Sequence, residues 1–236
     1  MKKIIILFGT LLCLQINAFS QNNKMYGVFE SQTLFQVGMI EDSAGNQVKS
    51  ILRFAPVANY TLQAHKDFFK SFGIYTGIGV KNVGFITRNN STDITVKSRA
   101  YCISVPVGLK FGNLKDEKYL FIAGEFLTQL DYKEKVFTDG DKSKRKSFYN
   151  NDVNLFNYSG SIGLSFKGFI IGADYTFGNF FSDKYRFQPS KASNATYAGP
   201  SRSNILTFYF GIRTNLSAEK VAAPEKQLQQ AKLYQY

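Results

Sequence analysis

Apolar and polar residues alternate along most of this chain, with the period of two that is typical of β-strands. Between residues 101 and 112, large apolar side chains such as Ile103, Val105 and Leu109 alternate with small side chains and with Lys110. The same alternation recurs elsewhere, and the sequence predicts eight strands at residues 25–40, 51–64, 72–85, 101–112, 118–130, 155–167, 169–178 and 204–216. At about 10–14 residues each, these strands exceed the 5–6 residues common in globular proteins and are long enough to cross a membrane when tilted.

The connections between the predicted strands are alternately long and short. The long ones cover residues 41–50, 86–97, 131–154 and 179–203, and the short ones cover residues 65–71, 113–117 and 167–168. Outer-membrane barrels have short periplasmic turns and longer outer loops. Because the strand number is even, both termini are expected at the short-turn end, on the periplasmic side.

The two faces of the strands differ in a way that indicates which of them meets lipid. One face is large and apolar, whereas the other is rich in Gly, Ser, Ala, Thr and Gln and carries few charges. A face exposed to water would carry many more Lys and Glu. The sequence therefore predicts an all-β fold, an eight-stranded antiparallel up-and-down transmembrane β-barrel, with a secreted soluble lipocalin-like barrel as the alternative. Pro106 has no N–H to donate in a closed sheet, so we expect a bulge or a missing ladder bond there.

A few charged residues occur on the small face, which would line the lumen. An eight-stranded barrel has an interior just wide enough for side chains. Buried charges are costly unless they are paired, so we expect Glu30, Glu125 and Asp174 to neutralise the cations and plug the lumen. A proton or ion path through this network is the alternative. The predicted lumen network consists of Glu30, Arg53, Lys81, Lys110, Glu125, Asp174 and Arg213.

The N-terminus has the features of a signal peptide. Lys2 and Lys3 precede an apolar stretch at residues 4–14, and Ala18 and Ser20 are small residues suited to cleavage after position 20. We therefore expect a signal peptide at residues 1–20, a barrel at residues 21–216 and a periplasmic tail at residues 217–236. A lipoprotein anchored through Cys13 is the alternative.

The chain is basic, with a formal net charge of +12. An exported protein meets anionic lipid rather than nucleic acid, so the basic charge favours a membrane surface. Four cations lie close together in the third long loop, and we expect them to contact phosphate groups of lipopolysaccharide, unless the loop is merely solvated. These cations are Lys142, Lys144, Arg145 and Lys146.

The sequence offers little for catalysis, so we predict no enzymatic activity, no cofactor and no metal site. His65 is the one histidine, and it lies in a predicted short turn. Carboxylates at Asp139, Asp141 and Asp152 could bind calcium, but the Asp139-Gly140-Asp141 segment is first of all a turn.

Two segments resemble the small outer-membrane β-barrel family of Gram-negative bacteria, with OmpA/OmpX-like architecture. Residues 104–111 (SVPVGLKF) are similar to a strand of its PorT-like "outer membrane protein beta-barrel domain" group, and residues 209–216 (YFGIRTNL) resemble the terminal strand read by the barrel-insertion machinery. The resemblance implies an outer-membrane monomer with a structural or interaction role, inserted by that machinery. A secretion- or transport-accessory role through the loops or the tail is the alternative.

Overall fold

The computed structural model describes residues 25–89, 93–138, 141–149, 151–188 and 197–216. The predicted signal peptide, residues 1–20, and the predicted tail, residues 217–236, lie outside the described residues. Both segments therefore stay predictions.

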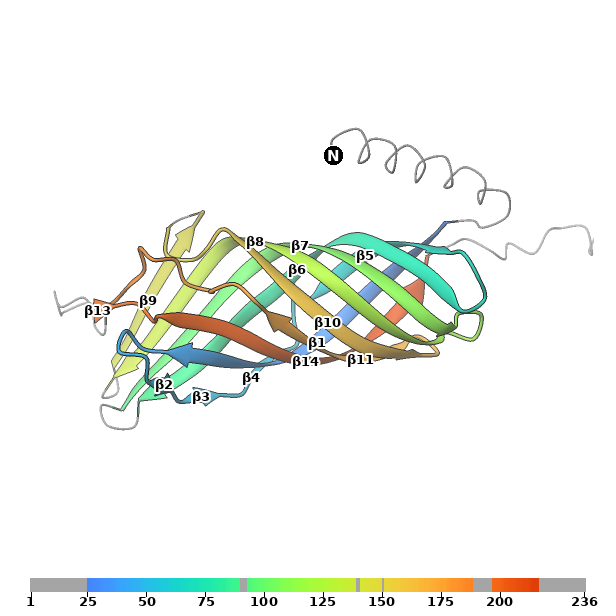
Figure 1. The fold of residues 1–236 in the computed structure, drawn as a ribbon. Coiled ribbons are helices and arrows are strands. Elements are labelled where there is room, and N and C mark those ends of the chain that lie inside the picture. Colours follow the sequence, from blue (N-terminus) through green and yellow to red (C-terminus); the bar gives the residue numbers. More distant parts are fainter. Residues whose placement is uncertain (1–24, 90–92, 139–140, 150, 189–196, 217–236) are drawn as a thin grey trace, which may run out of the picture.

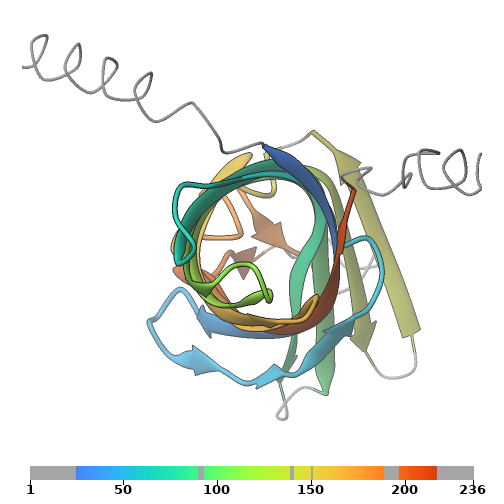
Figure 2. The same ribbon diagram turned by 90° about the vertical axis from the view of Figure 1, so that its right-hand side faces the viewer.

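Antiparallel strands form a sheet that closes into a ring, as the view along the barrel in Figure 2 shows. Around the ring, the order is β10–β11–β14–β1–β5–β6–β7–β8, and β8 pairs with β10 to complete it. The ring strands are β1 (Tyr26–Glu41), β5 (Tyr60–Asp67), β6 (Phe72–Asn89), β7 (Ile94–Asn113), β8 (Lys118–Thr138), β10 (Phe156–Phe166), β11 (Phe169–Thr176) and β14 (Arg202–Asn215). The predicted all-β antiparallel barrel is confirmed as a class.

The sheet contains twelve strands in the described residues, eight around the closed ring and four more beside it, whereas the sequence analysis expected eight strands in all. One reason is that the predicted strand at residues 51–64 is divided into β3 (Ser50–Ile51), β4 (Arg53–Ala55) and β5. Pro56 has no N–H for the ladder, and Ala58 has a φ of 64°, so the chain leaves the sheet between β4 and β5. β2 (Gln47–Val48) pairs with the end of β1 and adds a further short strand.

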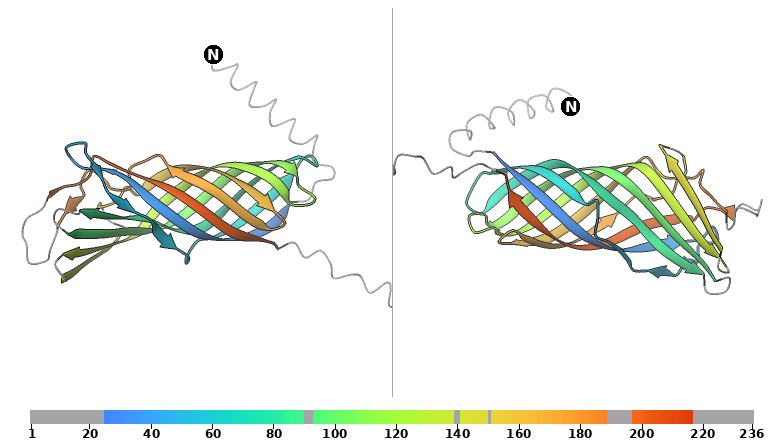
Figure 3. Two further views of the ribbon diagram at one scale, coloured as in Figure 1. Left: turned by 90° about the horizontal axis from the view of Figure 1, so that it is seen from below. Right: turned by 180° about the vertical axis from the view of Figure 1, so that it is seen from behind.

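The outer parts of β6, β7 and β8, together with β9, extend beyond the closed ring as a continuation of the same sheet, which we call the projecting sheet (Figures 1 and 3). β8 has 21 residues, which at the usual rise is about 70 Å, far more than a tilted strand needs to cross a hydrocarbon core of about 30 Å. β9 (Asp141–Phe148) pairs with its outer end. The predicted loops at residues 86–97 and 131–154 are therefore largely strand, because the alternation continues there with charged residues in place of apolar ones.

The outward and inward faces of the ring have opposite character. Large apolar side chains such as Leu62, Val107 and Phe210 are more than half exposed on the outside. Polar side chains such as Gln36 and Ser104 are completely buried inside. This is the reverse of a soluble lipocalin-like barrel, and it is the arrangement of a barrel whose outer wall meets lipid.

The expected interruption at Pro106 is confirmed on one side of β7. Between β6 and β7 the register is continuous up to Thr76 opposite Val107, and it resumes only at Gly79 opposite Ser104. The Thr76 hydroxyl donates a hydrogen bond to the Pro106 carbonyl at 2.9 Å. The missing N–H of Pro106 thus falls where the ladder is open.

Aromatic rings occupy much of the interior, and small residues on the inward face make room for them. A Cβ atom added to Gly108 would lie 2.4 Å from the ring of Tyr75, and one added to Gly172 would lie 2.5 Å from the Tyr209 hydroxyl. The alternation of small and large residues in the sequence therefore reflects packing across the lumen.

Candidate functional site

A cluster of charges lies at the centre of the barrel. The Lys81 ammonium of β6 contacts an Asp174 carboxylate oxygen of β11 at 3.0 Å and also pairs with Glu125 of β8. The Ser159 hydroxyl of β10 donates to the same Asp174 oxygen at 3.0 Å. The side chains of Lys81, Glu125 and Asp174 are all nearly buried. Three of the predicted lumen residues therefore meet in one cluster.

A second cluster lies next to it along the barrel. The Arg213 guanidinium of β14 pairs with Glu30 of β1 and donates a hydrogen bond to the Tyr119 hydroxyl of β8 at 2.9 Å. The same guanidinium lies 4.6 Å from the centroid of the Phe121 ring. Gln32 donates to the other Glu30 oxygen at 2.6 Å, so both carboxylate oxygens are bonded.

Lys110 is completely buried, and its carboxylate partner is one that the sequence analysis did not consider. Its ammonium contacts Asp67 of β5 at 2.6 Å and donates to the Tyr26 hydroxyl at 2.9 Å and to His65 Nδ1 at 3.1 Å. His65 Nε2 then donates to Gln63 at 2.8 Å. His65 therefore lies inside the barrel rather than in a turn, because the inward positions of β5 continue past residue 64.

Arg53 differs from the other predicted lumen cations. Its guanidinium donates to the Asn82 side-chain oxygen at 2.5 Å, to the Asn82 carbonyl at 3.2 Å and to Gln36. Among the residues that the structure describes, no carboxylate lies within ion-pair distance of it. The expected neutralisation by Glu30, Glu125 or Asp174 is therefore wrong for Arg53, since the break at Pro56 directs β4 toward the wall between β1 and β6.

At the outer end, Arg145 belongs to the interior rather than to an exposed basic run. It pairs with the buried Glu134 at 3.4 Å and lies 5.2 Å from the Tyr185 ring centroid. The Tyr132 hydroxyl donates to Glu134 at 2.7 Å, and Tyr185 donates to the same oxygen. Burial, together with the nearby carboxylate, raises the pKa of both Tyr132 and Tyr185. Successive residues of a strand point to opposite faces, so Arg145 must lie on the face opposite to Lys144 and Lys146. This alternation could have predicted its inward position from the sequence.

The exposed face of the projecting sheet carries like charges in register. Lys97, Lys135 and Lys144 lie directly opposite one another on β7, β8 and β9. Arg99, Lys133 and Lys146 form the next such row, and Lys142 lies opposite Phe137. Desolvation and the surrounding cations lower the pKa of Lys133 and of Lys135. Three of the four predicted basic-loop residues thus remain on the surface, Lys146 within 3.7 Å of Asp131.

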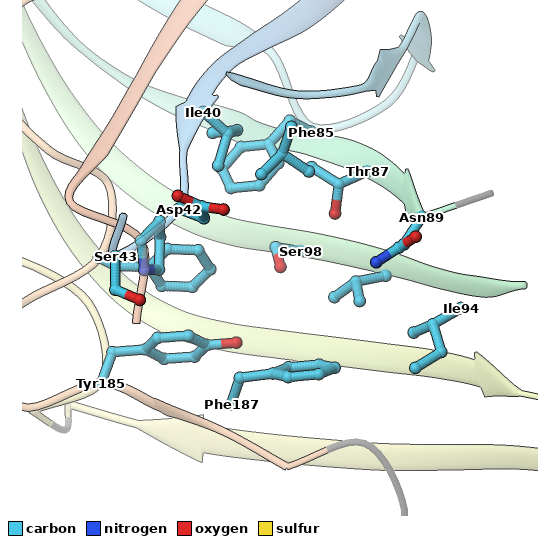
Figure 4. Close-up of a pocket in the computed structure, with 14 residues that line it drawn as sticks. Ile40, Asp42, Ser43, Phe85, Thr87, Asn89, Ile94, Ser98, Tyr185 and Phe187 are labelled. Atoms are coloured by element: carbon cyan, nitrogen blue, oxygen red, sulfur yellow. The ribbon is translucent and has the colours of Figure 1, made fainter. Parts of the chain in front are cut away.

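A cavity of about 370 Å³ lies inside the outer end of the barrel, as Figure 4 shows. Phe85, Tyr185 and Phe187 line it, with Ile40 and Ser98. The carboxylate of Asp42 at its rim accepts hydrogen bonds from the backbone N–H groups of residues 44 and 46. The cavity is therefore mainly apolar.

The described residues contain no group of three or more His, Cys, Asp or Glu side chains that could hold a metal ion. Cys102 is buried and unpaired. In the part of the chain that the structure describes, no helix has the length and apolar character to cross a membrane.

Comparison with known proteins identifies a family and several similar folds. No curated protein matches the sequence. Among solved structures, the chain is similar to Ail of Yersinia pestis, with 13% identity, a TM-score of 0.38, and coverage of 80% of this chain and 99% of Ail. It is also similar to Neisserial surface protein A, with 12% identity, a TM-score of 0.37, and coverage of 81% and 99%. The β-barrel domain of Pseudomonas aeruginosa OprF has 6% identity, a TM-score of 0.31, and coverage of 81% and 100%.

The family assignment comes from the sequence itself. Residues 15–183 match the family described as outer membrane protein beta-barrel domain, which is more than half of the chain. The apolar outer wall and polar interior of the ring agree with this assignment. The chain therefore belongs to the outer membrane protein beta-barrel domain family and is a protein of the outer membrane.

Proposed function

We propose that this chain is a non-enzymatic outer-membrane barrel with a filled lumen, which has a structural or interaction role through the surface at its outer end. The observation that carries the proposal is the contact between Lys81 and Asp174 at 3.0 Å. Their strands, β6 and β11, are separated by β14, β1 and β5 around one side of the ring. A direct ion pair between them therefore crosses the lumen.

The space around this ion pair also supports a filled lumen. Only about 30 Å³ remains between the side chains of the two central clusters, including Arg213, Glu30 and Lys81. The cavity at the outer end, at about 370 Å³, is more than ten times larger by the same measure. The lumen is therefore narrowest at the two central clusters, which supports a filled interior there.

Two further observations support a role without catalysis. Both ring nitrogens of the buried His65 are engaged, one by Lys110 and one by Gln63. The Cys102 thiol is buried among apolar side chains. A histidine base or a cysteine nucleophile would have to reach a substrate.

Conductance across planar lipid bilayers tests the filled lumen. The refolded full chain should insert without producing steps in conductance, whereas stable ion-conducting events would refute a plugged barrel. A porin reconstituted in the same bilayers is the positive control. Heat-modifiable migration on a gel would show separately that the chain had folded.

We also propose that the termini face the periplasm and that the projecting sheet faces outward. The short turns at residues 68–71, 114–117 and 167–168 lie at the same end as the start of β1 and the end of β14 (Figure 1). In intact cells, an epitope inserted beside Tyr149 should be accessible to antibody, and one placed after residue 216 should not. The opposite labelling would invert the orientation.

With that orientation, Lys142, Lys144 and Lys146 of β9 would meet the anionic headgroup layer of lipopolysaccharide. All three are exposed, and each cation near an anionic surface contributes about 1 kcal/mol of attraction. Replacing all three with Gln should weaken binding to lipopolysaccharide micelles and reduce its salt dependence. Unchanged binding would exclude β9 as the contact surface.

A further inference from the structure

A second cavity, of about 390 Å³, lies between the segment 53–57 and the neighbouring strands β6, β7 and β8. We call it the cationic pocket, because five of its lining residues are basic: Arg53, Lys97, Arg99, Lys133 and Lys135. Lys97 and Arg99 share the outward face of β7 with Ile103 and Val105, whose side chains are exposed. The pocket therefore belongs to the outer side of the barrel, directly above its apolar wall.

None of these five cations has a carboxylate within ion-pair distance among the described residues. Neutral oxygens of Gln36 and Asn82 hold the Arg53 guanidinium. The Nε of Arg99 is buried without a hydrogen-bond partner. In the interior, by contrast, Lys81, Lys110 and Arg213 are all ion-paired.

The sheet itself forces these cations together. Lys97 lies directly opposite Lys135, and Arg99 lies directly opposite Lys133, so each row places like charges on adjacent strands. Like charges in that position repel and destabilise the pairing. An anion bound between the rows would replace this repulsion with attraction.

The other wall of the pocket is apolar. Phe54, Pro56 and Val57 line it, with Phe54 60% and Val57 63% exposed. Tyr101, whose ring lies 5.1 Å from the Arg99 guanidinium carbon, completes the lower rim. Below Tyr101, the outer wall continues with Ile103 and Val105. A ligand that satisfies both walls has an anionic head and an apolar chain.

We propose that the cationic pocket binds the phosphorylated headgroup of an outer-leaflet lipid, whose acyl chain lies along Phe54 and Val57. A phosphate group carries up to two negative charges and offers several acceptor oxygens, which suits convergent Arg and Lys donors better than a single carboxylate does. The apolar wall favours a lipid over a free anion. The inference rests on the proposed function, because only an outward-facing outer end would place this pocket at the outer leaflet.

The test measures lipid binding by the full chain in nanodiscs of phosphatidylcholine that contain a small fraction of phosphatidic acid. Wild type should retain about one phosphatidic acid per chain. The double variant Lys97→Gln/Arg99→Gln should bind it about 30-fold more weakly, since each cation beside an anionic headgroup contributes a factor of about five. Lys49→Gln/Lys184→Gln removes the same charge from exposed sites outside both the pocket and β9, and it should bind like wild type.

A second variant examines the apolar wall. Val57→Ser should weaken phosphatidic acid binding and leave competition by inorganic phosphate unchanged. Equal losses in the pocket variant and in the Lys49/Lys184 control would overturn the inference in favour of diffuse surface attraction. Wild-type binding by the pocket variant, or equal retention of phosphatidylcholine and phosphatidic acid, would also overturn it. If a variant lost inorganic phosphate binding but still bound phosphatidic acid, the apolar wall alone would hold the acyl chain of the lipid. That result would contradict a headgroup site.

This experiment is independent of the tests of the proposed function. Nanodiscs are open on both sides, so binding does not depend on orientation, and it does not depend on conductance. If the barrel produces no conductance steps and has the proposed orientation but does not bind phosphatidic acid, only the lipid site is refuted. Specific binding in a chain whose epitopes show the opposite orientation would instead remove the outer-leaflet assignment. Each variant is first shown to fold by heat-modifiable gel migration.

Discussion

Replacing Lys81 with Met would leave two carboxylates without their cation inside the barrel. Lys81 contacts Asp174 at 3.0 Å and also pairs with Glu125, and Ser159 is the next polar neighbour of both acids. The Lys81 side chain is 8% exposed, the Asp174 side chain 3% and the Glu125 side chain 11%. Water therefore cannot replace the ammonium without opening the lumen.

The size of the effect follows from this burial. Removing one partner of a buried ion pair typically costs about 3–5 kcal/mol, because the other partner stays buried and unpaired. With a denaturant slope of about 2 kcal/mol per molar urea, such a loss moves the unfolding midpoint down by about 2 M. Neutralising all three groups, with Lys81→Met, Glu125→Gln and Asp174→Asn together, should recover most of the loss, because no uncompensated charge remains.

The folded fraction can be followed by gel mobility after incubation in urea, which is useful because the chain contains no Trp. Lys184→Met, which removes an exposed cation, should leave the midpoint within about 0.25 M of wild type, since ordinary surface substitutions change the unfolding free energy by about 0.5 kcal/mol or less. If Lys81→Met were as stable as this control, the central cluster would not be the charge network that fills the lumen. If the triple variant were as unstable as the single one, the loss would be due to packing rather than to charge.

Three further predictions concern packing and the outer end. Gly108→Val should destabilise the barrel by about 1–3 kcal/mol, because its Cβ would lie 2.4 Å from the Tyr75 ring; a urea midpoint equal to that of wild type would contradict this packing. Arg145→Gln should cost about 1–3 kcal/mol in unfolding free energy by removing the cation of the buried Glu134, yet leave lipopolysaccharide binding unchanged; the reverse result would restore Arg145 to the lipid-facing surface. Because burial raises the pKa of Tyr185, Tyr185→Phe should leave the phenolate absorbance of the folded chain unchanged near pH 11 and lower that of the unfolded chain. The raised pKa means that the stability contribution of Tyr185 is present below about pH 10 and is lost as the pH rises further.

The sequence was most informative where each strand has one apolar and one polar face. From residue 101 to residue 112 the alternation identified the outward positions of Val107 and Leu109 and the inward position of Lys110. The same reasoning failed beyond the apolar wall, where residues 132–136 keep the period of two but place Lys133 and Lys135 on the outward face. A strand without an apolar stripe resembles a loop in composition, so its length could not be obtained from hydropathy alone.

The partners of the interior charges were predictable as a set but not pair by pair. Lys110 reaches Asp67 because β5 continues to that residue, and this extension depends on the pairing of β5 with β6 and β1. Arg53 reaches Asn82 because the chain breaks at Pro56. Both outcomes depend on register around a closed sheet, which a pattern of single residues does not contain.

The projecting sheet explains why the basic charge of the chain remains unbalanced on one side. Along β8, Glu134 points inward to Tyr132, Tyr185 and Arg145, while Lys133 and Lys135 point outward. Successive side chains of a strand lie on opposite faces, so the inner acid cannot pair with the outer cations, and desolvation and neighbouring cations lower the pKa of Lys133 and of Lys135. The strand period thus separates Glu134 from these lysines, and Asp131, 3.7 Å from Lys146, offers one carboxylate to a face with many more cations, so an external anion would neutralise the rest. An outer leaflet rich in phosphate would provide that anion along the whole height of the projecting sheet.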